Sequence, residues 1–222
     1  MKKFVFIILI LLLTSIFVFS IYKIFYTSYD NKKASFLYEE VKKDNEEKVN
    51  LQETNKDYKF WLTIPNTQID YPVVQGIDND FYLNHDFYKN PSLSGTLFLD
   101  YRNTVNIDKN IIIYGHNMKN GSMFNNLVYY KNPTFFNNNK KISLTINDIT
   151  FEYDVFQVVI AKEDNVYLNG SITSFEEFKS YLNTNGLYDV YFNISDKDNF
   201  LTLYSCSYEY AGARILVFAK RI

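Results

Sequence analysis

The sequence predicts a mainly β domain with short helices, folded as a closed or partly closed β-barrel and preceded by an N-terminal transmembrane helix. From Phe60 onward, short apolar or alternating runs are separated by turns rich in Asn, Asp and Gly, a pattern typical of strands. Tyr and Phe occur 20 times each, and aromatic side chains favour strands. Ahead of this region stands a long apolar run from Phe4 to Tyr22.

Composition excludes several classes of protein. A length of 222 residues suits one domain with an appendage. The 23 basic and 25 acidic residues give a net charge of −2, which argues against a nucleic-acid partner. With 7 Gly and 4 Pro the chain is neither collagen-like nor low in complexity. Its single cysteine excludes an intramolecular disulfide and any multi-cysteine metal site.

Residues 1–26 are expected to form a membrane anchor. The 19-residue apolar run would span about 28 Å as a helix, close to the thickness of a bilayer core. A cleaved signal peptide needs a shorter run and a small-x-small cleavage site, and the run ends without an Ala or Gly pair. Lys2 and Lys3 favour an N-terminus inside the cell. We therefore expect a single-pass protein of the cell membrane with its remaining chain extracellular.

Residues 27–58 are expected to be a polar, helical spacer. Charged residues dominate, and sparse apolar residues such as Phe36, Leu37 and Val41 recur at roughly helical intervals. The simplest interpretation is a solvated face without a partner. The catalytic or binding domain then occupies residues 59–222.

Eight strands are predicted in that domain, at Phe60–Ile64, Ile69–Val74, Gly95–Asp100, Asn110–Tyr114, Lys141–Ile146, Thr150–Ile160, Phe200–Ser205 and Arg214–Lys220. Short helices are predicted at Asp80–Asn84, Met123–Tyr130 and Thr173–Leu182. The last is the clearest, because Thr173 and Glu176 have the spacing of a capping box. Many short strands with few helices favour a barrel.

Three residues that can carry chemistry stand at predicted strand ends. Cys206 ends an apolar strand and is either a nucleophile or a buried core residue. His116 follows another strand, after Gly115, which would permit a sharp turn, and can act as a proton donor or acceptor or serve as a structural His. Arg214 begins the last strand and can stabilise an oxyanion or form a surface ion pair. His85, in a polar loop, is expected to be a surface residue.

The segment Thr202-Leu203-Tyr204-Ser205-Cys206 resembles the TLxTC signature of sortases, with Ser205 where Thr is usual. Arg214 on the following strand, the Gly115-His116-Asn117 turn and the segments 69–75 and 95–100 are also similar. The resemblance covers about residues 58–222. It is greatest to class B sortases, because an insertion bearing the Thr173–Leu182 helix precedes the cysteine strand.

The resemblance implies an eight-stranded sortase-type barrel and a membrane-anchored cysteine transpeptidase with Cys206, His116 and Arg214 as its triad. Cys206 would attack the Thr carbonyl of a C-terminal sorting motif in a secreted protein and form a thioester. An amine of a lipid-linked peptidoglycan precursor would then resolve it. His116 would protonate the leaving amine, and Arg214 would stabilise the oxyanion or hold the substrate backbone.

By position within the class, the resemblance also suggests residues that line the substrate groove. They are Asn79, Leu83, Tyr167, Tyr204 and Ser207. Core packing for Leu83 and a plain loop aromatic for Tyr167 are the alternatives. No metal site and no cofactor are expected, since no tight acidic cluster stands in the domain.

Two rival functions stay open from the sequence. One is a pilin-polymerising sortase, whose acceptor is a Lys amine on another protein; the chain's end at Ile222, directly after the last strand, argues against it. The other is a membrane-tethered barrel that binds a ligand without turnover, with Cys206 buried and inert.

Overall fold

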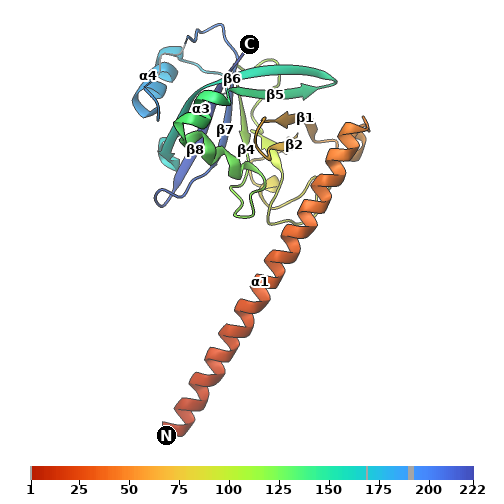
Figure 1. Cartoon of the computed structure of the whole chain (residues 1–222), viewed down its shortest axis with the longest axis vertical. Helices are drawn as coiled ribbons and strands as arrows, with labels where there is room; N and C mark the ends of the chain where they lie inside the picture. The colour runs from red at the N-terminus through yellow and green to blue at the C-terminus, as the bar shows by residue number, and fades with distance from the viewer. Residues whose placement is uncertain (1, 169, 190–192) are drawn as a thin grey trace.

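The computed structural model describes residues 2–168, 170–189 and 193–222. It begins with one uninterrupted helix, α1 (Lys2–Glu46), followed by the short α2 (Leu51–Thr54). The expected boundary between anchor and spacer at residue 26 thus falls inside a single helix. The N-terminal part of α1 extends away from the barrel (Figure 1), and it is long and apolar enough to cross a membrane.

The second part of α1 packs on the barrel, so the expectation of a spacer without a partner was wrong. Ala34, Leu37, Tyr38 and Val41 are buried, and they share one helical face because they recur every three or four residues. Phe36, on another face, is 76% exposed. The helical spacing of these apolar residues in the sequence therefore marks a real buried face, and this face packs on the barrel.

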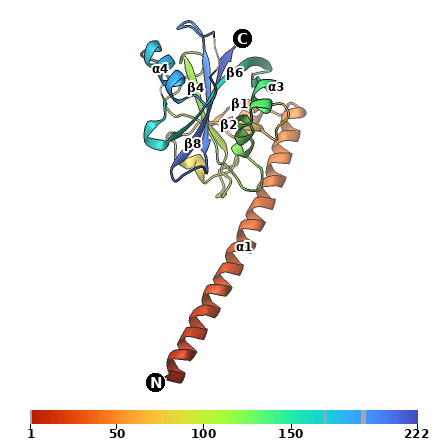
Figure 2. The ribbon, with the colours of Figure 1, turned by 60° about the vertical axis from the view of Figure 1, so that its left-hand side comes forward.

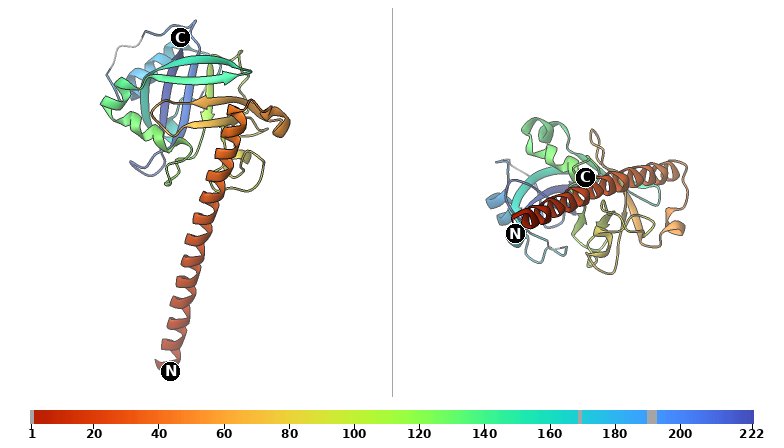
Figure 3. Two further views of the ribbon diagram at one scale, coloured as in Figure 1. Left: turned by 45° about the vertical axis from the view of Figure 1, so that its right-hand side comes forward. Right: turned by 90° about the horizontal axis from the view of Figure 1, so that it is seen from below.

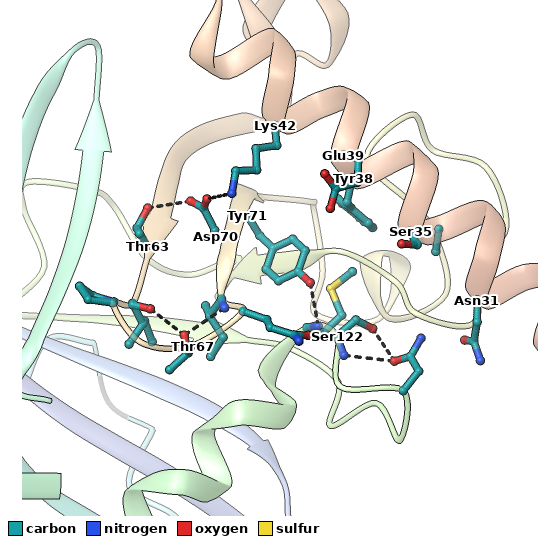
Figure 4. A pocket seen from close by; sticks show the side chains of 17 residues that line it. Asn31, Ser35, Tyr38, Glu39, Lys42, Thr63, Thr67, Asp70, Tyr71 and Ser122 are labelled. Atoms are coloured by element: carbon teal, nitrogen blue, oxygen red, sulfur yellow. Dashed lines mark hydrogen bonds and ion pairs between the residues drawn. The ribbon is translucent and has the colours of Figure 1, made fainter. Parts of the chain in front are cut away.

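Polar contacts reinforce this docking. The Tyr38 hydroxyl donates to the Gly95 carbonyl at 2.6 Å, and Lys42 forms an ion pair with Asp70 at 2.6 Å. The Thr63 hydroxyl donates to the same carboxylate at 2.9 Å. These contacts border a pocket of about 580 Å³ between α1 and the connection from β1 to β2 (Figure 4). None of the three predicted catalytic residues lines it.

All eight predicted strands are present, and they close into a barrel. They are β1 (Tyr58–Thr63), β2 (Asp70–Val74), β3 (Leu97–Leu99), β4 (Asn110–Tyr114), β5 (Lys141–Ile146), β6 (Ile149–Lys162), β7 (Phe200–Cys206) and β8 (Ala213–Arg221). Neighbours follow the order β1-β2-β3-β4-β7-β8-β6-β5, closing between β5 and β1. The predicted mainly β barrel is confirmed.

Apolar side chains form two clusters, one on each side of the barrel wall. Leu203 and Val217 belong to the cluster inside the barrel. Phe200 and Phe218, from the other faces of the same strands, pack with Phe178 of α4 (Phe175–Asn185) in the second cluster. Because side chains alternate along a strand, β7 and β8 contribute to both clusters.

The short helices differ from prediction in detail. Besides α4 they are η1 (Phe81–Leu83), η2 (Phe124–Lys131), α3 (Pro133–Asn138) and η3 (Glu163–Asn165). The N-cap of α4 is Ser174, whose hydroxyl accepts from the Glu177 N–H, so the capping residue lies one position after the predicted Thr173. Helix α3 was not predicted; the Asn132 side chain caps it, accepting from the N–H groups of Thr134 and Phe135.

The barrel has a defined orientation relative to α1. The connection between β7 and β8 lies at the end of the barrel nearer the chain's N-terminus, and the C-terminus lies at the opposite end (Figures 1 and 2). The views in Figure 3 agree with this arrangement. The end of β7 and the start of β8 therefore lie at the end of the barrel toward which the apolar N-terminal half of α1 extends.

Candidate active site

Cys206 is the last residue of β7 and lies opposite Arg214 of β8 in the antiparallel register. Leu201 and Leu203 point into the barrel, so the alternation along β7 places Tyr204 and Cys206 on the outer face. Cys206 is only partly buried and is a free thiol. The alternative of a buried, inert core cysteine does not fit this placement.

His116 is brought beside Cys206 by the parallel pairing of β4 and β7. The register runs from Asn110 opposite Phe200 to Tyr114 opposite Tyr204, and the Gly115 N–H then donates to the Tyr204 carbonyl at 3.2 Å. His116 and Cys206 each stand two residues beyond the last pair. Since adjacent strands lie about 4.8 Å apart, the two residues leave the barrel side by side.

The imidazole of His116 is oriented by η1. Its Nε2 lies 2.7 Å from the carbonyl oxygen of Leu83. Because a carbonyl oxygen only accepts hydrogen bonds, we assign a proton to Nε2, which leaves Nδ1 to exchange a proton with a reacting group. His85, the other histidine, stacks on Phe81 at 3.9 Å between ring centroids and is half-buried in the η1 region.

A glycine is required at position 115 because neighbouring side chains approach its backbone closely. A Cβ at this position would lie 2.3 Å from Leu97 Cδ2 and 2.7 Å from Phe124 Cδ2. Its backbone φ is not in the left-handed region, so the predicted need for a sharp turn is replaced by a steric one. The Gly115 carbonyl accepts from the Ser205 hydroxyl at 2.7 Å, so Ser in place of the usual Thr keeps this contact.

Arg214 is held by three groups. Nε donates to the Tyr204 hydroxyl at 2.9 Å, Nη1 to the Ala213 carbonyl at 3.1 Å, and Nη2 to Glu163 at 2.6 Å. Burial lowers the pKa of the guanidinium, but the neighbouring Cys206 and Tyr204 raise it above its ordinary value. The side chain is thus a fixed cation beside the thiol, able to stabilise negative charge there.

The structure brings three of the five predicted substrate-binding residues close to these groups. Tyr204 accepts from Arg214, the Leu83 carbonyl contacts His116, and Ser207 is buried with its N–H donating to the Ala213 carbonyl. Burial raises the pKa of the Tyr204 hydroxyl, which therefore stays protonated at neutral pH.

The other two lie in different surroundings. The Asn79 amide donates to Asp100 at 3.2 Å and accepts from the Tyr101 N–H at 3.0 Å. Tyr167 packs on Phe178 of α4, with 5.1 Å between ring centroids. The groove-lining roles of all five residues stay predictions.

Two contacts of the site were not foreseen from sequence. Glu163, at the start of the connection from β6 to β7, binds Arg214. Asn117, directly after His116, binds the main chain of Cys206. The position of Asn117 next to the histidine was a usable signal; Glu163 gave none, because its partner is 51 residues away.

Comparisons with known proteins agree with this geometry. The sortase domain family matches residues 62–222. Sortase B of Listeria monocytogenes is 34% identical over 234 residues, spanning 96% of this chain and 95% of the relative. The X-ray structure of Clostridium perfringens sortase B is 38% identical, with a TM-score of 0.73 and coverage of 79% of this chain and 99% of that one.

A third relative was solved as a complex. The Staphylococcus aureus sortase B–substrate complex is 26% identical, with a TM-score of 0.77 and coverage of 87% and 98%. Together with the closed eight-stranded barrel, these matches confirm the class suggested by the cysteine segment and the helix-bearing insertion. The chain belongs to the sortase family, as a class B member, and is a sortase-type cysteine transpeptidase.

Proposed function

We propose that this enzyme cleaves a C-terminal sorting motif after Thr and transfers the secreted protein to an amine of a lipid-linked peptidoglycan precursor. The observation that carries the proposal is the register of three strands. It sets His116 beside Cys206 through β4 and β7, and Arg214 opposite Cys206 through β8. A nucleophile, a proton carrier and an oxyanion-stabilising cation are the groups that acyl transfer needs.

In the first half-reaction the Cys206 thiolate attacks the Thr carbonyl carbon and forms a C–S bond. Arg214, as a fixed cation, stabilises the charge that develops on the carbonyl oxygen. The C–N bond to the following residue then breaks, and the departing amine takes a proton from the His116 imidazolium. The products are a thioester on Cys206 and a free C-terminal tail.

In the second half-reaction the acceptor amine attacks the thioester carbonyl. Neutral His116 takes the proton from this amine, the C–S bond breaks, and the thiolate is restored. The net change replaces one peptide bond by an amide bond to the acceptor.

We further propose that α1 crosses the cell membrane once, with Lys2 and Lys3 inside and the barrel outside. Support comes from the exposed apolar surface of residues 4–26 and from the basic N-terminal flank. This topology would place the enzyme where exported substrates and a lipid-linked acceptor meet. A secreted substrate supplied in trans is consistent with the relative solved as a substrate complex.

The test uses the full-length enzyme in detergent with peptides bearing Pro-x-Thr-Gly or Pro-x-Thr-Asn cores. Each is incubated with a diaminopimelate-containing stem peptide, with a Gly-extended one, with a protein that offers a Lys amine, or with no acceptor, and products are identified by mass spectrometry. We expect cleavage after Thr and joining of the acceptor, and no product from Cys206→Ala. Joining only to a Lys amine on a protein acceptor would favour the pilin-polymerising rival. Absence of Cys206-dependent cleavage from every peptide would refute the proposal.

A further inference from the structure

Asn117 contacts both segments that the reaction brings together. It follows His116 directly and is 6% exposed. Its side-chain Nδ2 donates to the main-chain carbonyl of Cys206 at 2.9 Å, and its Oδ1 accepts from the Asn125 amide at 2.8 Å. Its own carbonyl accepts from the Tyr208 hydroxyl at 3.0 Å. One residue therefore joins the histidine turn to Cys206 and to the connection between β7 and β8.

We propose that Asn117 is a positioning residue of the transpeptidase reaction, which holds the main chain of His116 at a fixed separation from Cys206. The inference rests on the proposed catalytic roles of those two residues. Asn117 acts through them and does not itself touch the reacting atoms.

The need for such a residue follows from where the strand pairing stops. The last main-chain hydrogen bond between β4 and β7 in the described structure runs from the Gly115 N–H to the Tyr204 carbonyl. Beyond it, the described structure has no further main-chain hydrogen bond between the two segments, at the point where His116 and Cys206 stand. The Asn117 amide supplies the next link between them, in place of a further backbone hydrogen bond.

Contacts on both sides of each catalytic residue complete the arrangement. One residue before His116 and Cys206, the Ser205 hydroxyl donates to the Gly115 carbonyl at 2.7 Å. Beyond His116, the Asn117 amide donates to the Cys206 carbonyl, and the Asn117 carbonyl accepts from the Tyr208 hydroxyl. The histidine turn is thus fastened to the cysteine strand at two points that enclose His116. A displacement of about 1 Å between reacting groups can cost about 100-fold in rate.

The Asn117 amide is itself held in place. Asn125, in η2, donates to its Oδ1, which fixes the orientation that presents Nδ2 to Cys206. The neighbouring Asn120 offers a contrast, because its Oδ1 accepts from the N–H and hydroxyl of Ser122 within the same turn. Replacing Asn120 removes an amide from the same loop without touching the cysteine segment.

The experiment compares full-length Asn117→Ala, Asn117→Asp and the matched control Asn120→Ala. For a peptide cleaved by the wild type, we expect Asn117→Ala to lower kcat about 30- to 100-fold with KM changed less than about 3-fold. Asn117→Asp cannot donate to the Cys206 carbonyl and repels it, so kcat falls at least as far. Asn120→Ala should stay within about 2-fold of wild type in both constants.

A second readout separates positioning from stability. The rate of Cys206 alkylation is measured against pH for each folded variant, because it reports the thiolate and its imidazole neighbour. We expect the pH at which the alkylation rate rises to differ between Asn117→Ala and the wild type, and to be the same in Asn120→Ala as in the wild type. Wild-type kcat and a wild-type profile in Asn117→Ala would overturn the inference, as would a rate loss fully accounted for by a lower folded fraction.

If Asn117→Ala does not fold, Tyr208→Phe supplies the decision. Tyr208 is 66% exposed, so its hydroxyl can be removed with little effect on stability. We then expect a 3- to 10-fold lower kcat, from loss of its bond to the Asn117 carbonyl. An unchanged kcat would count against the inference. His116→Ala and Cys206→Ala test the proposed function separately: activity in either refutes the function, whereas their inactivity beside a normal Asn117→Ala refutes only the positioning role.

Discussion

Gly115→Ala is expected to damage both stability and catalysis, and the size of the effect follows from the packing around it. The added Cβ would meet Leu97 Cδ2 at 2.3 Å, and Phe124 Cδ2 and Cγ at 2.7 and 2.9 Å. Carbon atoms in ordinary contact lie about 3.5–4.0 Å apart, so side chains or backbone must move by more than about 1 Å. Leu97 and Phe124 are both fully buried, which leaves little room for them to yield.

Overpacking of this kind costs about 1–3 kcal/mol. At roughly 2–4 °C per kcal/mol for a domain of this size, the melting temperature should fall by roughly 2–12 °C. The movement that relieves the clash also displaces the turn carrying His116, so kcat should fall by about 10- to 100-fold.

The assay measures thermal unfolding and peptide cleavage of the full-length variant, with Gly76→Ala as the matched control. At Gly76 the nearest atoms to an added Cβ lie 3.4 Å away and φ is outside the left-handed region, so that variant should be neutral or slightly stabilised. A Gly115→Ala enzyme with the melting temperature and kcat of the wild type would refute the reasoning. Equal losses in both variants would show that the contacts with Leu97 and Phe124 are not the cause.

Three further outcomes are expected. Ser205→Ala should cost about 1–3 kcal/mol, because it leaves the Gly115 carbonyl unpaired, whereas Ser205→Thr should retain most of the stability in urea unfolding; equal losses would contradict this. Tyr38→Phe should cost about 1 kcal/mol in the same assay, and no change would mean that the Tyr38 hydroxyl does not stabilise the docking of α1. Burial alone would raise the pKa of Asp70, but hydrogen bonds from Lys42, Trp61 and Thr63 outweigh it and hold the pKa below its ordinary value. The charged carboxylate therefore stabilises the fold above about pH 4, and this contribution is lost as the pH falls. The difference in melting temperature between wild type and Asp70→Asn should therefore shrink between about pH 4 and 2, and a constant difference would contradict the assignment.

Much of the barrel was predictable because its strands are locally encoded. The predicted bounds of Asn110–Tyr114 and Lys141–Ile146 agree with β4 and β5 residue for residue, since apolar runs end sharply at turn residues there. The alignment of His116 with Cys206 was not derivable from local pattern, because it depends on a parallel pairing between strands 90 residues apart in the chain. The family resemblance supplied it instead.

Other features needed the tertiary structure. The apolar face of residues 34–41 carries a helical period, but its partner is a barrel that forms later in the chain, so a solvated face was the simpler interpretation. Gly115 was correctly singled out for the wrong reason, because crowding by Leu97 and Phe124 is invisible in one dimension. Helix α3 is short, and its Asn132 cap merges with surrounding asparagines that predict a loop equally well.

Because α1 is one continuous helix, its proposed membrane-spanning part and the part that packs on the barrel are joined without a break. Each residue of a helix adds about 1.5 Å of height and about 100° of rotation. One residue inserted between Tyr26 and Asp30 would therefore rotate the barrel by about 100° around the axis of α1 and move it by only about 1.5 Å along that axis. Four inserted residues would move the barrel by about 6 Å along the axis and leave it rotated by only about 40° from its original orientation. If α1 crosses the membrane as proposed, the direction in which the Cys206 end faces and its height above the bilayer can thus be varied separately, and their effects on access to the proposed lipid-linked acceptor can be distinguished.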